Sequence, residues 1–386
     1  MTSPASGADK ESAASLSTSC WHSLPPLQQQ HVFPTMAKLD DTLFVIGGCT
    51  QTGQPIDSCE SIRLGSGDGD IAESWSAAPS LPTPRAGVQL ATLDKRVYAF
   101  GGSGPGQSGV ATIDALDVES QQWLELAGCP SPSRAAPRGG KFFIAGGMET
   151  ATSTRNEFYC FDPERKKVGN LPPMSVKRYS PGCFLVEESL YLFGGREGRT
   201  PVAGCEVFDF RACKWRPLPD LPSHGRVFPI YARTGRRVLC MGGLDPGNLA
   251  SGFSCLCHSF DLDTEQWSEC ANLLIGRADA AQCTLDDGRV ILAAGFDNTG
   301  RPSTSCHLYR PDSDTWTEHS ALPSGHMSCA YLAAGARLYL AGGIAEGSLS
   351  QAVDYLDLAA LISTVNVSPY AAASNNFKSL KSCCPS

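Results

Sequence analysis

A Gly-Gly doublet that recurs along the chain limits its possible folds more than any other feature. The doublets begin at Gly47, Gly101, Gly146, Gly194, Gly242 and Gly342, and an Ala-Gly pair occupies the same place at Ala294. Successive positions lie 45 to 54 residues apart. A period of roughly 20 to 50 residues is typical of arrays of small structural units that bury their apolar faces only against one another.

Each unit is predicted to contain four short strands. The clearest unit, residues 178–222, has short apolar runs rich in β-branched and aromatic residues, separated by Gly, Pro and Asp. A tryptophan follows most doublets, at Trp75, Trp123, Trp215, Trp267 and Trp316, and Val168 takes this place in the third unit. Four-stranded units repeated around an axis are the blades of a β-propeller. The chain is therefore predicted to be an all-β, seven-bladed β-propeller.

A further tryptophan indicates how the ring closes. Trp21 precedes the doublet at Gly47 by 26 residues, the interval that also separates Trp75 from Gly101. Residues 20–24 are therefore predicted to supply the fourth strand of a blade whose other strands lie in residues 326–358. Such closure removes the exposed sheet edges of an open array. The competing interpretation takes LISTVNV, residues 361–367, as the fourth strand.

The repeats also define the domain organisation. Residues 1–19 are rich in Ser and Ala and are predicted to be disordered. The propeller occupies residues 20–358, with blades at about 32–78, 85–127, 134–173, 178–219, 226–271, 277–320 and 326–358 plus 20–24. An insertion, LGSGDGD (64–70), lengthens the first blade, and the third is short before its doublet, so its first strand is expected to be irregular. Residues 359–386 are predicted to form a loosely attached tail.

The doublet, the delayed tryptophan and the arginine before the first strand resemble the kelch repeat across residues 20–358. The segments GGCTQTGQPID (47–57), PSLPTPRAG (79–87), GGREGRTPVAGCEVFD (194–209) and GGIAEGSLSQAV (342–353) are similar to the kelch domain-containing protein 8 family. This resemblance implies a propeller without the BTB or F-box module that ties many kelch proteins to ubiquitin ligases. It also suggests a cytoplasmic role in a cell-division or cytoskeletal context.

Basic residues recur at the start of the blades and are the candidate binding residues. Counting back 16 residues from a doublet reaches His31, Arg85, Arg178, Arg226 and His326, while Arg277 lies 17 residues before Ala294 and Arg134 lies 12 before Gly146. Because they begin the innermost strands, these seven side chains are expected to surround one mouth of the central channel. There they would bind carboxylates, which Arg can hold in bidentate fashion. The alternative is that each one hydrogen-bonds loop carbonyls of an adjacent blade, and both interpretations stay open.

Other motifs give no catalytic, metal or cofactor site. A phosphate-binding loop needs a strand that leads into a helix, whereas another strand is predicted after each doublet. Cys205, Cys257 and Cys306 each lie ten residues before a tryptophan position, which indicates equivalent buried sites rather than a zinc ligand set. No nucleophile elbow is present.

Composition limits the kinds of partner and the cellular compartment that are expected for the chain. The net charge of −8 and the pI of about 5.4 give no nucleic-acid footprint. No apolar run reaches the length of a membrane span, and residues 1–19 lack a secretory core. Without such a signal, the odd total of 17 cysteines favours reduced thiols in a cytoplasmic chain, expected to be a monomer. The terminal KSLKSCCPS outlines a prenylation signal at Cys383, with Cys384 as an auxiliary, although Pro385 replaces a residue that is usually aliphatic.

These observations favour a non-enzymatic interaction scaffold that binds an acidic or polar peptide or protein segment at a basic channel mouth. Two alternatives remain. One is an enzyme of kelch-like fold, an oxidase or a sugar isomerase. The other is a substrate-recognition adaptor of a ubiquitin ligase whose partner carries the missing module.

Overall fold

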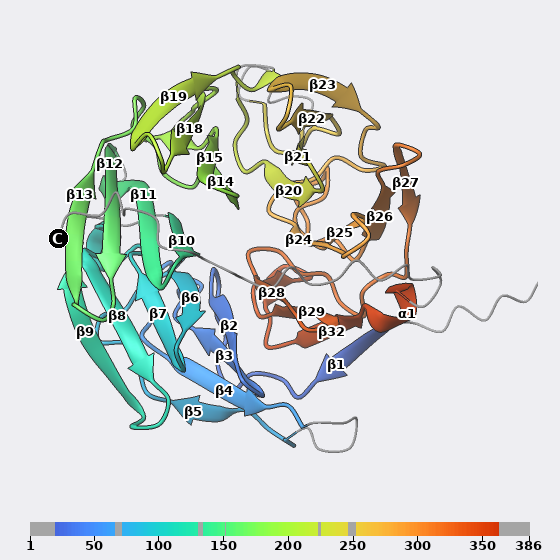
Figure 1. The fold of residues 1–386 in the computed structure, drawn as a ribbon. Helices are drawn as coiled ribbons and strands as arrows, with labels where there is room; N and C mark the ends of the chain where they lie inside the picture. The colour runs from blue at the N-terminus through green and yellow to red at the C-terminus, as the bar shows by residue number, and fades with distance from the viewer. Residues whose placement is uncertain are drawn as a thin grey trace, which may run out of the picture.

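The computed structural model describes residues 20–65, 72–129, 134–150, 152–222, 225–245 and 252–362. Within these ranges, seven four-stranded antiparallel sheets stand around a central axis (Figure 1). The prediction of an all-β, seven-bladed propeller is confirmed. The predicted disordered segment 1–19 and most of the predicted tail lie outside the described residues.

The blades are numbered in the order of their innermost strands. Blades 1 to 3 consist of β2 (Thr35–Leu39), β3 (Thr42–Ile46), β4 (Cys59–Arg63) and β5 (Ser76–Ala78); β6 (Gln89–Leu93), β7 (Arg96–Phe100), β8 (Thr112–Asp117) and β9 (Gln122–Gly128); and β10 (Arg134–Arg138), β11 (Lys141–Thr150), β12 (Ser153–Asp162) and β13 (Lys167–Leu171). Blades 4 and 5 consist of β14 (Gly182–Val186), β15 (Ser189–Phe193), β18 (Cys205–Asp209) and β19 (Lys214–Leu218); and β20 (Ile230–Thr234), β21 (Arg237–Met241), β22 (Cys257–Asp261) and β23 (Gln266–Cys270).

Blades 6 and 7 complete the ring. They consist of β24 (Ala281–Thr284), β25 (Val290–Ala293), β26 (Cys306–Arg310) and β27 (Thr315–Glu318); and β28 (Ala330–Ala334), β29 (Arg337–Ala341), β32 (Val353–Asp357) and β1 (Trp21–Leu24). The remaining described elements lie in loops or after the last blade: the hairpin of β16 (Arg196–Glu197) and β17 (Thr200–Pro201), the hairpin of β30 (Ile344–Ala345) and β31 (Ser348–Leu349), the short 3₁₀ helix Pro105–Gln107, and α1 (Ala359–Ile362). No helix in the described ranges is both long and apolar enough to cross a membrane.

Each blade presents its two kinds of connection at opposite ends of the channel. The innermost strands β2, β6, β10, β14, β20, β24 and β28 contact one another around the ring (Figure 1). Because the strands alternate in direction, the loops after the second strand and the links between blades share one end, called here the mouth face. The tight turns after the first and third strands lie at the other end.

The N-terminal strand closes the ring, as predicted. β1 pairs antiparallel with β32, from Trp21 opposite Leu356 to Leu24 opposite Val353, and Figure 1 shows the blue strand beside the red one. The competing interpretation, a strand at 361–367, is wrong in its described part, because Leu361 belongs to α1. The last blade is therefore built from both ends of the described chain.

The glycine doublets allow two blades to approach closely. Gly47 has a φ of +64°, and a Cβ placed on it would lie 2.5 Å from the backbone oxygen of Arg85 in the next blade. A side chain here would face both a strained backbone and a direct clash. The doublets are therefore packing sites between blades.

The apolar core is divided into sectors between neighbouring blades. Seven buried clusters each combine residues from two adjacent blades, and together they run around the described ring. Between blades 3 and 4, for example, the rings of Phe158 and Phe208 stack edge to face with centroids 4.8 Å apart. Every blade therefore depends on both neighbours for burial, which explains why the repeat needs a closed ring.

The tryptophans connect neighbouring blades, in keeping with their equivalent positions in the repeats. The indole Nε1 of Trp316 donates a hydrogen bond to the backbone oxygen of Ala271 in blade 5, at 3.0 Å. The same contact to the preceding blade is made by Trp21, Trp75, Trp123, Trp215 and Trp267. Val168 has no indole N–H, so blade 3 lacks this bond.

The third blade differs from the expectation of an irregular first strand. β10 pairs with β11 over five residues, from Arg134 opposite Ala145 to Arg138 opposite Lys141. The irregularity lies instead in β11, where the register shifts between Ala145 and Gly147. The strand continues through its doublet with a bulge, which re-aims the chain without ending the ladder.

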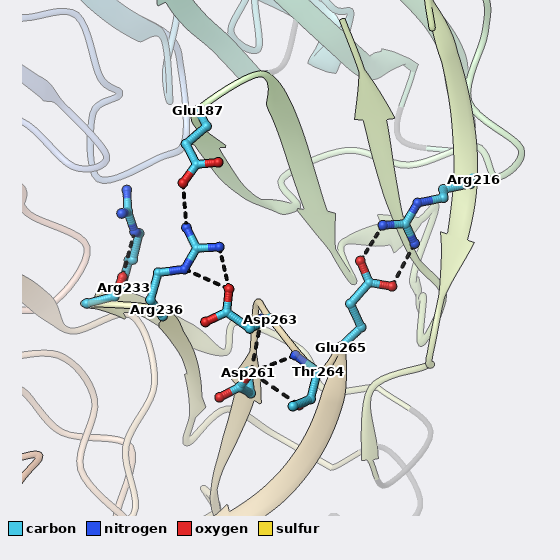
Figure 2. A network of polar contacts seen from close by, with 9 residues as sticks. Glu187, Arg216, Arg233, Arg236, Asp261, Asp263, Thr264 and Glu265 are labelled. Atoms are coloured by element: carbon cyan, nitrogen blue, oxygen red, sulfur yellow. Dashed lines mark hydrogen bonds and ion pairs between the residues drawn. The ribbon is translucent and has the colours of Figure 1, made fainter. Parts of the chain in front are cut away.

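Exposed ion pairs add a polar link between blades 4 and 5 (Figure 2). Arg236 donates to Glu187 at 2.9 Å and to Asp263 at 2.6 Å, and Arg216 makes a two-pronged contact with Glu265. Glu187 and Arg236 stand on the first turns of neighbouring blades. These side chains are largely solvated, so the network contributes little compared with the apolar sectors.

Candidate functional site

Six of the seven predicted basic residues lie inside the blades. His31, Arg85, Arg178, Arg226, Arg277 and His326 are at most 3% exposed. Each turns back into its own blade, where hydrogen-bond acceptors compensate the cost of burying a charge. The expectation that these six side chains are presented to the channel opening is therefore corrected.

Arg178 illustrates how these residues are held. Its Nη1 donates to the backbone oxygens of Gly194 and Gly204, at 2.7 and 2.6 Å, and its Nη2 pairs with Glu206 at 2.8 Å. Its own backbone oxygen accepts a hydrogen bond from Gly147 in the preceding blade, at 3.0 Å. The residue therefore ties its own doublet to that of its neighbour. The alternative interpretation of the sequence was that each basic side chain donates to loop carbonyls of an adjacent blade. The Arg178 side chain instead donates to carbonyls and a carboxylate of its own blade.

The buried partners occupy one position on the third strand of six blades, blade 3 being the exception. They are Glu60, Asp114, Glu206, His258, His307 and Asp354, paired with His31, Arg85, Arg178, Arg226, Arg277 and His326 respectively. The sequence analysis recognised the shared register of Cys205, Cys257 and Cys306 but missed the carboxylates that lie one residue after this register. Those carboxylates, nine residues before Trp123 and Trp215, were the available signal that the basic residues are internal.

Blades 5 and 6 keep the arginine but replace the carboxylate with histidine. Nη2 of Arg226 lies 2.6 Å from Nδ1 of His258, and Nη2 of Arg277 lies 3.2 Å from Nδ1 of His307. Burial and the neighbouring guanidinium lower the pKa of His307 to about 4, so this imidazole is a neutral acceptor at physiological pH. These two blades therefore bury a cation beside a neutral partner.

Arg134 is half-buried, whereas the other six predicted residues are buried. It is the first residue of β10, in the register that Gln89 occupies in β6. Nε donates to the backbone oxygen of Pro181 and Nη1 to Oε1 of Gln89, both at 3.2 Å. Among the described residues no carboxylate lies within ion-pair distance of this guanidinium. Arg134 lies 12 residues before its doublet, whereas the other six lie 16 or 17 residues before theirs, and this difference places its side chain outside the buried position.

A ring of residues two positions after the buried Arg and His side chains forms the mouth, and the sequence analysis missed it. Phe33, Ser180, Phe228, Asp279 and Ser328 all have φ between 49° and 54°, and Gly87 has a φ of 62° in blade 2. Residues other than glycine rarely adopt this conformation, which tends to be kept at functional sites. Phe33 and Phe228 are 46% and 51% exposed there. The buried cations hold the loops that present this ring.

A cavity of about 570 Å³ opens at the mouth face, and all seven blades contribute to its walls. Its aromatic residues include Phe33, Tyr179, Phe228 and Tyr331. Arg196, on the β16–β17 hairpin, is held between two of these rings, with its Cζ 5.5 Å from the centroid of Tyr179 and 5.2 Å from that of Phe228. Its Nε is buried and has no hydrogen-bond partner among the described residues.

The cavity is lined by charges of both signs. Arg134, Arg196 and Arg226 belong to blades 3, 4 and 5, whereas Asp279 belongs to blade 6. Burial raises the pKa of Asp279 to about 6, against the opposing effect of hydrogen bonds from Ser328. Such an arrangement can bind a polar segment, because exposed aromatic rings add contact area and guanidiniums add directed hydrogen bonds.

The cysteines predicted to be small buried residues are so placed. Cys205, Cys257 and Cys306 begin β18, β22 and β26 and are at most 3% exposed. In the described part of the chain, no group of three His, Cys, Asp or Glu side chains is arranged to hold a metal ion. The lipidation candidates Cys383 and Cys384 lie outside the described residues.

The chain is similar to several proteins of one family. Residues 133–343 match the model of the KLHDC2/KLHL20/DRC7 Kelch-repeats domain, and residues 84–130 match the Kelch motif. Kelch domain-containing protein 8B of Homo sapiens is 33% identical over 170 residues, which cover 42% of this chain and 48% of that protein. Kelch repeat and BTB domain-containing protein 13 of Homo sapiens is 29% identical over 175 residues, covering 42% of this chain and 38% of that protein.

A solved structure supports the same fold. The structure of YjhT superposes with a TM-score of 0.58 at 15% identity, covering 77% of this chain and 99% of that one. The chain spans about half the length of the curated relatives that it matches first. The family model covers more than half of the chain, and the seven sheets carry the doublets and tryptophans of the repeat, so this chain belongs to the kelch-repeat family.

Proposed function

We propose that this propeller is a non-enzymatic interaction module that binds a peptide or protein segment at its mouth cavity. The observation that carries the proposal is the Arg196 guanidinium, held between Tyr179 and Phe228 with no carboxylate partner among the described residues. A carboxylate of a partner satisfies such a group with two hydrogen bonds, and the flanking rings exclude water from the contact. Arg134 offers a second cation in the same cavity.

This proposal moves the binding residues away from the buried cations. Arg85, Arg178 and the other internal residues act by holding the loops, whereas Arg134, Arg196 and the exposed rings of Phe33 and Phe228 contact the partner. Arginine and large aromatic residues are the types that supply most of the binding energy in protein interfaces. A cytoplasmic monomer in a cell-division or cytoskeletal context is the setting that the resemblance to kelch domain-containing protein 8 suggests.

The test is affinity capture followed by direct binding. We expect wild-type protein to retain a set of partners that the Arg134→Ala/Arg196→Ala variant loses, with an unchanged melting temperature. Arg165→Ala is the matched control, because Arg165 is exposed in the turn between β12 and β13, away from the mouth face. A captured partner is then measured with purified proteins. If the double variant keeps every partner at wild-type affinity, the mouth is not the binding site.

A second candidate is a recognition subunit that works with a separate ligase module. The similarity to a relative whose name includes a BTB domain favours it. The same capture experiment separates the two candidates, because a ligase adaptor co-purifies with ligase components that persist in the Arg134→Ala/Arg196→Ala variant.

A further inference from the structure

We propose that Asp279 is a cation-binding subsite of the mouth cavity, so that the bound segment carries a basic side chain as well as an acidic group. This inference rests on the proposed function and extends it to the chemistry of the partner. The basic group is a lysine ammonium or an arginine guanidinium that reaches the blade 6 side of the cavity while the acidic group contacts Arg134 and Arg196.

The geometry of Asp279 is that of a prepared acceptor. It follows Arg277, the buried cation of blade 6, by two residues and has a φ of 53°, a conformation that costs energy for a residue with a side chain. Its carboxylate accepts hydrogen bonds from the hydroxyl and the backbone N–H of Ser328 in blade 7. The second oxygen, Oδ2, is buried and has no hydrogen-bond partner among the described residues. The Asp279 carboxylate is thus held by Ser328 through hydrogen bonds, while Oδ2 remains available to accept one from a ligand.

Within the described ranges, no basic side chain pairs with Asp279. The titratable groups that interact with it are Cys329 and Tyr331, both on the blade 7 side. No Lys, Arg or His of the described chain lies within ion-pair distance of Asp279. By contrast, the buried carboxylates of the third strands are each paired with an Arg or His: Glu60, Asp114, Glu206 and Asp354. A lone carboxylate in a desolvated cavity is costly, and an incoming cation removes that cost.

Tyr331 adds a second contact for a cation. The residue is 42% exposed, lines the cavity and interacts electrostatically with Arg134 as well as with Asp279. Aromatic faces attract ammonium and guanidinium groups, and the attraction is strongest where water is excluded. Blades 6 and 7 therefore offer a negative and aromatic wall. Blades 3 and 4 offer Arg134 and Arg196 to the same cavity, so a bound segment meets both signs of charge.

The experiment selects ligands from a random linear peptide library displayed on phage, with the full chain as bait. We expect wild-type protein to enrich peptides that combine Asp or Glu with a Lys or Arg at a preferred spacing. Selection on Asp279→Asn should keep the acidic preference and lose the basic one. A peptide selected on wild type should bind Asp279→Asn roughly tenfold or more weakly, which is the scale of one lost charged hydrogen bond.

A double-mutant cycle assigns the loss to the proposed contact. Replacing the basic residue of the peptide by Gln should weaken binding to wild type and have little further effect on Asp279→Asn. Asp312→Asn is the control, because Asp312 is exposed in the turn between β26 and β27. Asparagine tolerates positive φ, so the Asp279→Asn variant keeps its fold, and its melting temperature checks this.

The outcomes separate the two proposals. Peptides that depend on Arg134 and Arg196 but show no basic preference, or an additive cycle, would overturn the role of Asp279 alone. If no peptide is enriched on wild type relative to the Arg134→Ala/Arg196→Ala variant, the proposed function fails and the subsite fails with it.

Discussion

At the scale of single residues, charge is used in two different ways. Arg178 and Glu206 are almost completely buried and satisfy each other, whereas Arg196 and Asp279 line a cavity without an ionic partner in the described chain. Breaking a buried ion pair leaves one charge uncompensated and destabilises the fold, while removing an unpaired, desolvated charge removes its desolvation cost and stabilises the fold. Substitutions of Arg178 and of Asp279 should therefore shift the free energy of unfolding in opposite directions.

For the buried pair, Arg178→Ala should lower the free energy of unfolding by about 3–5 kcal/mol, because Glu206 is left buried without a cation. Urea denaturation measures this loss. The combined variant Arg178→Met/Glu206→Leu should recover much of it, since neither charge remains. Arg236→Ala, which breaks only exposed ion pairs, should cost less than about 1 kcal/mol. Equal losses for Arg178→Ala and Arg236→Ala would contradict a tethering role for Arg178.

For the unpaired carboxylate, Asp279→Asn should raise the free energy of unfolding by about 1–2 kcal/mol at pH 7.5. The pKa of Asp279 is about 6 in the folded protein, above the ordinary value of 3.8. Its stabilising contribution is therefore greatest below pH 4 and is lost as the pH rises through 6. The advantage of Asp279→Asn should shrink when urea denaturation is repeated near pH 5. An unchanged stability at pH 7.5 would show that Asp279 is compensated.

The sequence located the buried cations but not the residues that face solvent. Counting back from the doublets reached Arg178 and Arg226 because a structural role repeats in every blade. Phe33, Phe228 and Asp279 share only a backbone conformation, and their side chains differ from blade to blade, so no residue pattern marks them. Arg196 is found only when the fold brings its hairpin between Tyr179 and Phe228. Residues with a structural role recur at the same place in each blade and can be found by their spacing, whereas the residues proposed to bind a partner differ from blade to blade.

At the scale of elements, the outer strands are joined by the tryptophans. The indole of Trp316 is 7% exposed and bonds the backbone of blade 5, while the contact made by Trp215 is exposed to solvent. When the indole N–H is removed, a solvent-exposed carbonyl can accept a hydrogen bond from water instead. A carbonyl shielded from solvent loses its hydrogen bond without replacement. The regular spacing of these residues is also why the strand order could be predicted from the sequence alone. The bulge in β11 could not, because it depends on how the third doublet pairs.

We therefore expect Trp316→Phe to reduce the free energy of unfolding by about 2 kcal/mol and Trp215→Phe by less than about 1 kcal/mol. Phenylalanine keeps much of the apolar contact and removes the N–H donor. Thermal or urea denaturation of the two variants gives the comparison directly. A larger loss for Trp215→Phe than for Trp316→Phe would mean that ring packing, rather than the hydrogen bond, sets the order.

At the scale of the whole molecule, stability depends on closing the ring. Each apolar sector needs two blades, and the last sectors form only when β1 joins β32. Trp21 and Leu24 are buried in those sectors, and Ser23 donates to Asp354 at 2.6 Å. Deleting residues 1–26 removes these contacts and exposes the edge of β32. The melting temperature should fall by about 5 °C or more, given a loss of several kcal/mol.

Two further variants distinguish loss of the strand from loss of the terminus. Deleting residues 1–19 keeps all of β1 and should leave the melting temperature unchanged. Moving residues 20–26 to follow residue 358 through a short Gly-Ser linker should restore it, because Cys20 and Asp357 are already hydrogen-bonded at 3.1 Å. The rescued chain would close as an ordinary hairpin, with β1 in its native register. If the 1–26 deletion melts at the wild-type temperature, closure by β1 is not what holds the ring, and the apolar sectors between the other blades suffice.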